Sequence, residues 1–382
     1  APLNTGTNAP PAEDDLPCGH LPIDDWNEAA LVGAVNLEWQ GGHRGARFGN
    51  QLFTAAVSIA LAMNSGKPII FPPPISKKQI HKLPCIRSSR HIGKLCTGCQ
   101  EDMIWQDRNQ SCGEGAGCLQ HLKSTRKIQY IGVGYHQNIR EWGKKPAVEW
   151  LPIFRQMFWA PVPQEPPAPL PSSTDLVIYF RSFFDRSFFD VWHMQMRVGH
   201  MPLAYYRWAA QHHRRVVSQS AKIWLVSAPE YRAHPTLLSI KTELGAELFE
   251  AMNDAEIPWL GDFTWVRSAS HIVLSCSTFG WWAGFLSYAT TIYAGLPPMP
   301  IPMPWCELLP DDPRYIFYDV LKEEEFKIFA SARKRCLEYQ ECNTKRDCPA
   351  IAQISEYYRE VISAFKANGS EIKYLRSHNV SV

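Results

Sequence analysis

The chain has 382 residues, which is too long for one ordinary hydrophobic core, so we expect two domains. Apolar residues make up 45% of the sequence and charged residues 20%, which is typical of a folded soluble protein. Lysine and arginine total 39 against 37 aspartate and glutamate, a net charge of +2 that gives no support for nucleic acid as the main partner.

Residues 1–30 begin with a polar, proline-rich stretch that we interpret as a flexible stem. This stretch lacks the basic start and apolar middle of a signal peptide. Nowhere does the sequence reach the run of roughly 18–20 apolar residues that crosses a membrane. If the protein is attached to a membrane, we expect the anchor to lie upstream of this sequence.

A first domain is expected over residues 31–165. Residues 31–40 have the pattern of a strand, a glycine-rich turn follows, and apolar residues recur at helical spacing from Leu52. A second strand at 67–71 completes a βαβ unit. The cysteine-rich segment 85–118 is predicted to be an irregular insertion in this domain.

A proline-rich segment at 161–174 has the composition of a stiff linker and is the best domain boundary in the chain. Strands and helices then alternate through a second domain, residues 172–320, which predicts a doubly wound parallel sheet. A helical extension is expected over 321–382. The predicted strands are 127–135 in the first domain and 175–180, 222–227, 270–277 and 290–295 in the second, and the predicted helices of the second are 202–217, 234–245 and 279–289.

Eleven cysteines fall mostly into two clusters, in the first half of the chain and near its end. Clusters in loop-like sequence favour disulfides and an oxidising compartment. Zinc is an alternative for the first cluster, because Cys96-x-x-Cys99 precedes Cys112 and Cys118. N-x-S/T sequons at Asn109, Asn368 and Asn379 also fit the secretory pathway. Cys276, in an apolar strand-like run, is the cysteine we expect to be free.

Three stretches carry candidate binding chemistry. Gly45–Gln51 lies between a strand and a helix, where glycines admit a ligand and helix N–H groups can meet an anion. Residues 275–282 run from a buried strand through Ser277 and Thr278, which are expected to cap a helix. Arg181 ends the strand 175–180, where its guanidinium could grip a phosphate. Each has an ordinary interpretation as well: a tight turn, a helix cap or a surface charge.

No Asp-x-Asp occurs, so a metal held between acidic side chains and a diphosphate has no evident site. No P-loop or H-E-x-x-H motif occurs either. The adjacent His212 and His213 lie on a predicted helix and point apart, which makes joint metal binding unfavourable. We therefore expect a diphosphate site without metal and no cofactor.

Four segments, in order, are similar to those of a known family: "RFGNQLF", the strand ending in Arg181, "PLAYYRWA" and "DFTWVRSASHIVLSCSTFGWWAGFLS". The chain resembles the α-1,2-fucosyltransferases, inverting enzymes that transfer fucose from GDP-fucose on a two-domain GT-B fold. The first and last segments are also similar to those of protein O-fucosyltransferases. The resemblance covers roughly residues 40–66 and 175–295.

The resemblance implies two Rossmann-like doubly wound domains facing a cleft, with the first on the acceptor side and the second binding GDP-fucose. It implies that Arg181, Arg47 and Asp185 are catalytic; Asp185, Asp190 and Asp262 are candidates for base or nucleoside contact. The donor-binding residues would be Phe48, Gly49, Asn50, Gln51, Asp262, Ser277, Thr278 and Phe279. The family's usual His-x-Arg-Arg-x-Asp reads here from Tyr179 to Phe184, with the first Arg kept as Arg181.

The function implied is transfer of L-fucose to a glycan hydroxyl, with α-1,2 linkage to a galactoside, in the Golgi lumen by a type II membrane protein. GDP-fucose and a galactose-containing glycan would be its partners. Two alternatives remain open. One is a protein O-fucosyltransferase or a transferase for another GDP-sugar, and the other is a non-catalytic, lectin-like glycan-binding protein.

Overall fold

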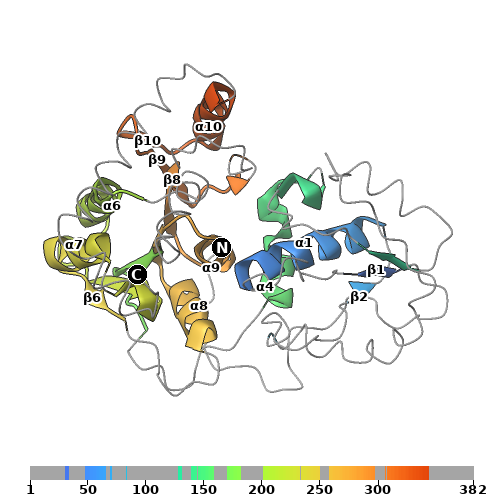
Figure 1. Ribbon diagram of the computed structural model, residues 1–382, viewed down its shortest axis with the longest axis horizontal. Coiled ribbons are helices and arrows are strands. Elements are labelled where there is room, and N and C mark those ends of the chain that lie inside the picture. Colours follow the sequence, from blue (N-terminus) through green and yellow to red (C-terminus); the bar gives the residue numbers. More distant parts are fainter. Residues whose placement is uncertain are drawn as a thin grey trace, which may run out of the picture. The chain divides into compact units, whose positions relative to one another are not determined.

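In a computed structural model, the chain forms two compact units (Figure 1). The first comprises residues 1–136, 140–145 and 149–164, and the second comprises 137–139, 146–148 and 165–382. The boundary near residue 165 falls inside the proline-rich segment 161–174. The residues that the structure describes are 31–33, 48–65, 69–70, 83, 128–130, 139–143, 145–158, 170–181, 201–232, 234–249, 258–296, 306 and 308–343.

The first unit contains a three-stranded parallel sheet in the order β2-β1-β3. Its strands are β1 (Leu31–Gly33), β2 (Ile69–Ile70) and β3 (Ile128–Tyr130), and its helices are α1 (Phe48–Ser65) and α4 (Leu151–Met157). Short 3-10 turns at Ile139–Trp142 and Ala147–Trp150 each include residues assigned to both units. The expected βαβ order, β1-α1-β2, is therefore present. The cysteine-rich segment 85–118 lies outside the described residues.

Helix α1 begins at Phe48, four residues before the predicted start at Leu52. The sequence predicts Gly49 in the loop before the helix, but Gly49 lies in the first turn of the helix and is buried. The predicted apolar positions Leu52, Ala55, Ala56, Ile59 and Ala60 are all buried. Aromatic rings continue this core, since Trp142 packs against Phe53 and edge-on against Phe154.

The second unit is built on a seven-stranded sheet in the order β10-β9-β8-β7-β4-β5-β6. Every neighbouring pair is parallel except β10 with β9, so this unit is an α/β fold with a mostly parallel sheet. The strands are β4 (Leu176–Phe180), β5 (Ile223–Ser227), β6 (Glu247–Leu248), β7 (His271–Leu274), β8 (Thr291–Leu296), β9 (Tyr315–Asp319) and β10 (Glu324–Phe326).

Four helices connect these strands in two packed pairs, which lie on either side of the sheet in Figure 1. The first pair is α6 (Leu203–Val216) with α7 (Pro235–Leu244), and the second is α8 (Pro258–Ser268) with α9 (Thr278–Leu286). Successive side chains of β4 point to opposite faces of the sheet. Ile178 and Phe180 join the core under α6 and α7, while Tyr179 stacks on Phe279 of α9. Central strands buried on both faces explain the continuous apolar runs that predicted them.

The region after β8 differs from the predictions. β8 is not the last strand, because β9 and β10 extend the sheet beyond it. Residues 324–326 form β10 rather than helix, and Glu323 has a φ of 54°, which lets the chain turn back on β9. Helix α10 (Phe329–Asn343) then follows, within the predicted helical extension.

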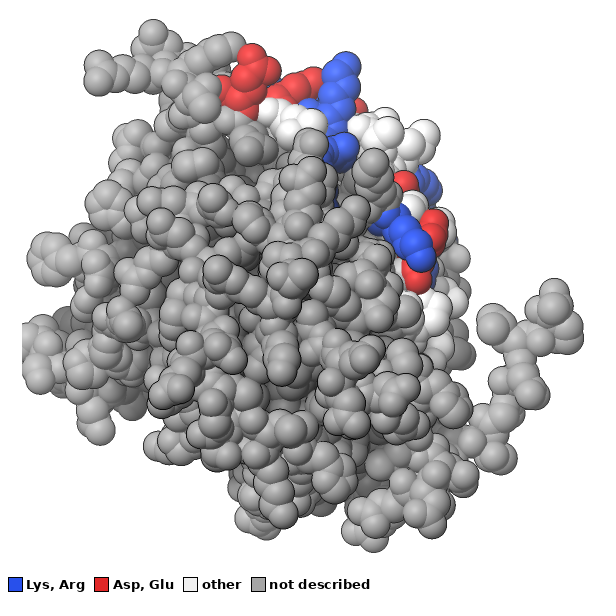
Figure 2. All heavy atoms as spheres, turned by 90° about the vertical axis from the view of Figure 1, so that its right-hand side faces the viewer, with Lys and Arg blue, Asp and Glu red and all other residues white. Residues whose placement is uncertain are grey.

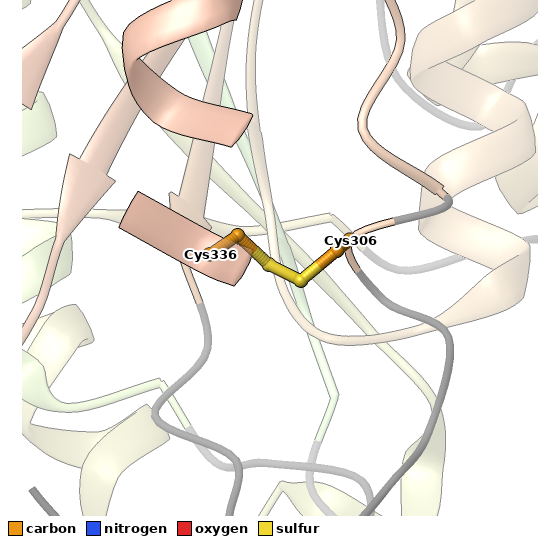
Figure 3. Close-up of a disulfide and its surroundings, with 2 residues drawn as sticks. All are labelled: Cys306 and Cys336. Carbon is orange, nitrogen blue, oxygen red and sulfur yellow. A yellow bond between two sulfur atoms is a disulfide. The ribbon is translucent and has the colours of Figure 1, made fainter. Parts of the chain in front are cut away.

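A disulfide between Cys306 and Cys336 ties the segment before β9 to α10 (Figure 3). Cys276 is a buried free thiol, as expected. Cys336 lies with Cys342 and Cys348 in the cysteine cluster near the end of the chain, whereas Cys306 stands apart from both clusters. The described bond therefore joins a member of a cluster to a separate cysteine. The expected disulfides of the first cluster fall outside the described residues.

Tyr205 of α6 links this helix to two strands of the sheet by hydrogen bonds. Its buried hydroxyl donates to the carbonyl oxygens of Leu274 in β7 and Tyr293 in β8, at 3.0 and 2.8 Å. Tyr205→Phe leaves both carbonyls without this donor and is expected to cost about 1–2 kcal/mol of stability. Thermal unfolding checks this. Tyr288→Phe, at a side chain 78% exposed, is the control and should change stability by less than about 0.5 kcal/mol.

Candidate ligand site at the carboxyl edge of the large sheet

The order of strands in the second unit defines a switch point between β4 and β7. The chain passes from β4 outward to β5 and β6, then returns to the other side of β4 with β7 and continues to β8 and β9. In doubly wound sheets, ligands bind outside the carboxyl ends of the strands at such a point. The residues that directly follow β4 and β7 are therefore the first candidates for a binding site.

Arg181 directly follows β4, as the sequence predicted. It is half-buried, and its guanidinium carbon lies 5.6 Å from the ring centroid of Tyr231. Tyr231 is fully buried and comes from the 3-10 turn Pro229–Tyr231 after β5. The aromatic face supports a cation at this edge of the sheet and limits its conformations. Tyr231 was missed in the sequence, because nothing local links it to Arg181.

Ser275, Cys276 and Ser277 connect β7 to α9 and are all buried. Ser277 holds the N-cap position with extended backbone, but its side chain makes no capping hydrogen bond. The expected capping role of its hydroxyl is therefore wrong. The start of α9 still presents the positive end of the helix dipole at the switch point, where it favours an anion.

An aromatic wall holds the first turn of α9 against β4. Tyr179, buried near the end of β4, stacks on Phe279 with ring centroids 5.2 Å apart. Phe263 of α8 packs edge-on against the same Phe279 ring at 5.3 Å. Gly280 follows, and a β-carbon placed there would lie 2.7 Å from the Tyr179 ring. A glycine at this position lets the helix start approach β4 closely.

Gly280→Ala should therefore destabilise the second unit by about 1–3 kcal/mol, because the Tyr179 ring must move. Gly261→Ala is the matched control, since Gly261 lies in α8 and a β-carbon there meets no atom within 4 Å. That substitution should stabilise by up to about 1 kcal/mol through helix propensity. Thermal unfolding of both variants decides; equal shifts would contradict the packing argument.

The remaining predicted site residues divide between the two units. Phe48, Gly49, Asn50 and Gln51 form the first turn of α1 in the first unit; Phe48 and Gln51 are buried and Asn50 is half-buried. Asp262 lies half-buried on α8, next to Phe263. Thr278 and Phe279, both half-buried, begin α9. Arg47, Asp185 and Asp190 lie outside the described residues. Arg181 and the Ser277–Phe279 helix start thus follow the carboxyl ends of the neighbouring parallel strands β4 and β7.

Among the described residues, no group of three or more His, Cys, Asp or Glu side chains is placed to hold a metal ion. No helix in the described ranges is both long and apolar enough to cross a membrane. On the face shown in Figure 2, acidic and basic side chains of the described residues are intermixed. The described residues of this face therefore do not form a patch of one charge.

The second unit belongs to the class of α/β proteins with a doubly wound, mostly parallel sheet, and its candidate site lies at the switch point. Comparison with protein-family models and with curated proteins finds no match for the chain. We therefore infer the function from the site and from the sequence motifs.

Proposed function

We propose that the protein is a fucosyltransferase that moves L-fucose from GDP-fucose to a glycan hydroxyl, with O2 of a galactoside as the acceptor position. The single observation that carries the proposal is that Arg181 and the start of α9 follow the carboxyl ends of the neighbouring strands β4 and β7, at the switch point of the sheet. A cation and a helix N-terminus on neighbouring strand ends suit a diphosphate. The motif resemblance supplies the identity of the sugar nucleotide.

In the proposed reaction, the second unit binds GDP-fucose and the first contributes the acceptor side of a GT-B cleft. The bond between the fucose anomeric carbon and the β-phosphate oxygen breaks, and the electron pair leaves with GDP. Arg181 and the N-terminus of α9 stabilise the negative charge that grows on the β-phosphate. The acceptor oxygen attacks the anomeric carbon from the opposite face and releases its proton to a base or to water.

A GDP-release assay tests this function directly. The protein is incubated with GDP-fucose, GDP-mannose or UDP-galactose, each with and without a galactoside acceptor. We expect acceptor-dependent GDP release with GDP-fucose alone, and a fucosylated product by mass spectrometry. Release only with a protein acceptor would indicate a protein O-fucosyltransferase, and glycan binding without release would indicate a lectin-like protein.

Transfer should survive an excess of EDTA, because the sequence offers no Asp-x-Asp to bridge a divalent ion and the diphosphate. We expect at least about half of the activity to remain, since Arg181 and the helix dipole supply the positive charge in this mechanism. Loss of activity with EDTA that manganese restores would show that the diphosphate is bound through a metal.

We also propose that the protein acts in the lumen of the secretory pathway. The Cys306–Cys336 disulfide supports an oxidising compartment, because disulfides are rare in reducing ones. Mass mapping without reduction would extend this to the other cysteines. Free thiols throughout residues 85–118, or stoichiometric zinc there, would count against this assignment.

A further inference from the structure

A cavity of about 50 Å³ lies at the same edge of the large sheet, on the β8 and β9 side of the turn before α9. Leu274 and the turn residues Ser275–Ser277 form one wall, and Leu308–Pro310 form another. Trp281 of α9 lines the cavity and donates its indole N–H to the carbonyl oxygen of Leu308 at 2.7 Å, which joins the two walls. No residue that lines this cavity carries a charge.

Two of the lining residues carry hydroxyl groups that lack a hydrogen-bond partner among the described residues. Ser275 is 6% exposed and Tyr315 is 2% exposed, and both hydroxyl oxygens are buried. A buried hydroxyl without a partner costs about 1–3 kcal/mol. Native proteins pair nearly all such groups, with protein, water or ligand. These two hydroxyls come from separate elements, the β7–α9 turn and the start of β9, yet their residues line one cavity.

The chemistry of the cavity favours a neutral polar group. Burial raises the pKa of the Cys276 thiol to about 12 and the pKa of the Tyr315 phenol still further above its usual range. Both groups therefore stay protonated and neutral, and Ser275 adds a further hydroxyl. Trp281 and Phe317 contribute aromatic surface. A charged group would lose its hydration here without gaining a counter-charge, whereas an alcohol can exchange hydrogen bonds and pack its C–H groups on the rings.

Size and position narrow the occupant further. About 50 Å³ accommodates a few non-hydrogen atoms, which is too little for a nucleoside but enough for one edge of a monosaccharide ring. Ser277 both lines this cavity and holds the N-cap position of α9. A molecule that places its diphosphate at the start of α9 therefore has a neighbouring group within reach of the cavity.

We propose that this cavity is the subsite for the hydroxyl-bearing edge of the donor's sugar ring, with Ser275 and Tyr315 as its hydrogen-bonding residues. The assignment rests on the proposed function for the diphosphate at α9. It predicts that the two hydroxyls distinguish a sugar nucleotide from the nucleoside diphosphate alone.

Calorimetry on the full chain tests the subsite with GDP and GDP-fucose as probes. The variants are Ser275→Ala and Tyr315→Phe, which remove one hydroxyl each and keep the shape of the wall. The controls are Ser220→Ala and Tyr288→Phe at exposed positions. We expect each cavity variant to weaken GDP-fucose binding by about 3- to 10-fold and to change GDP binding by less than about 2-fold. The control variants should leave both affinities unchanged.

Thermal unfolding without ligand gives a second readout, because removing a hydroxyl that lacks a partner should leave stability unchanged or raise it. If the variants raise the melting temperature but bind GDP and GDP-fucose as the wild type does, the hydroxyls have no role in binding and the subsite is overturned. If the cavity holds only water, the variants should raise or lower the melting temperature while the affinities for GDP and GDP-fucose stay unchanged. That result also overturns the subsite.

Free L-fucose, measured by saturation-transfer NMR, separates the failure of this inference from failure of the proposed function. If the wild type binds GDP-fucose and neither variant weakens that binding, the proposed function stands and this subsite is overturned. If the wild type does not bind GDP but binds free fucose, and both variants lose the fucose signal, the subsite stands and the proposed nucleotide site is overturned. Absence of binding in all arms overturns both proposals.

Discussion

We expect Arg181→Ala to lower the rate of the proposed fucosyl transfer by about 30- to 900-fold, which corresponds to about 2–4 kcal/mol of transition-state stabilisation. The side chain directly follows β4 at the switch point, where the proposed diphosphate lies next to the start of α9. In the proposed mechanism, its contact with the leaving phosphate strengthens as negative charge develops. The loss should therefore appear mainly in the turnover number at saturating GDP-fucose, and less in GDP affinity measured by calorimetry.

Two further variants make this result specific. Arg181→Lys keeps the charge but not the planar pair of donors, so it should recover only part of the lost rate. Arg207→Ala is the control, because Arg207 is exposed on α6 and pairs with Glu243 of α7. We expect wild-type turnover for this variant. Full turnover by Arg181→Ala at saturating donor would remove Arg181 from the mechanism.

The second unit should lose stability in mild acid, because it buries three histidines, of which His213 and His271 lie at the amino edge of its sheet. His213 of α6 is fully buried, with its Nε2 2.8 Å from the carbonyl oxygen of Thr174. Its ring packs edge-on against that of His271 in β7, with centroids 4.7 Å apart. His212 points the other way, toward the Tyr293 hydroxyl at 3.0 Å and Glu325 at 3.7 Å. Protonation would place a charge in this apolar region.

Burial lowers the pKa of His213 to about 4, with the neighbouring His271 acting in the same direction. Burial also lowers the pKa values of His271 and His212, the latter against the opposing charge of Glu325. An unfolded histidine titrates near about 6.5, so the unfolded chain binds more protons between these values. The stability that the neutral histidines contribute is fully present above about pH 6.5 and is lost as the pH falls toward 4. For His213 alone the total loss is about 3 kcal/mol, of which about 2 kcal/mol occurs between about pH 7 and 5.

Hydrogen–deuterium exchange of peptides from α6 and β7 at these two pH values measures this loss, after correction for intrinsic exchange. His213→Gln keeps a donor for Thr174 but does not titrate, so its exchange should depend less on pH even if the variant is less stable. Arg207→Ala, which retains all three histidines, should keep the wild-type pH dependence. An unchanged pH dependence in His213→Gln would contradict the assignment.

Local sequence signals predicted most elements of the second unit. β4, β5, β7 and β8 are short apolar runs bounded by polar or turn residues, and α6 and α7 have clear helical spacing, with Gly245 ending α7 at a φ of 65°. These signals fail where local and tertiary forces disagree. α8 was missed because its apolar residues surround the helix, as suits a helix packed between a sheet and a second helix. β6 has only two residues and depends on pairing with β5.

The candidate site likewise combines residues that local sequence predicts with residues that only the packing of distant segments reveals. The sequence pointed to Arg181 and to the Ser277–Phe279 turn, because polar residues directly after apolar strands are a local feature. Tyr179 was noted only as a departure from the family motif, and its ring is what forces Gly280 to be a glycine. Ser275 and Tyr315 could not be connected, since they are separated in sequence and share a cavity only through the packing of α9 and β9.

The sequence by itself determined where most of the strands and helices between β4 and β8 form, because strand and helix periodicity, Gly and Pro are local properties of the chain. Only the tertiary structure decided that β4 lies between β7 and β5, so that Arg181 and the start of α9 follow neighbouring strands. It also decided that three histidines lose contact with water, and that Ser275 and Tyr315 line one cavity. Strand order and burial arise from contacts between distant residues, whose free energies depend on the whole packed core rather than on any one segment.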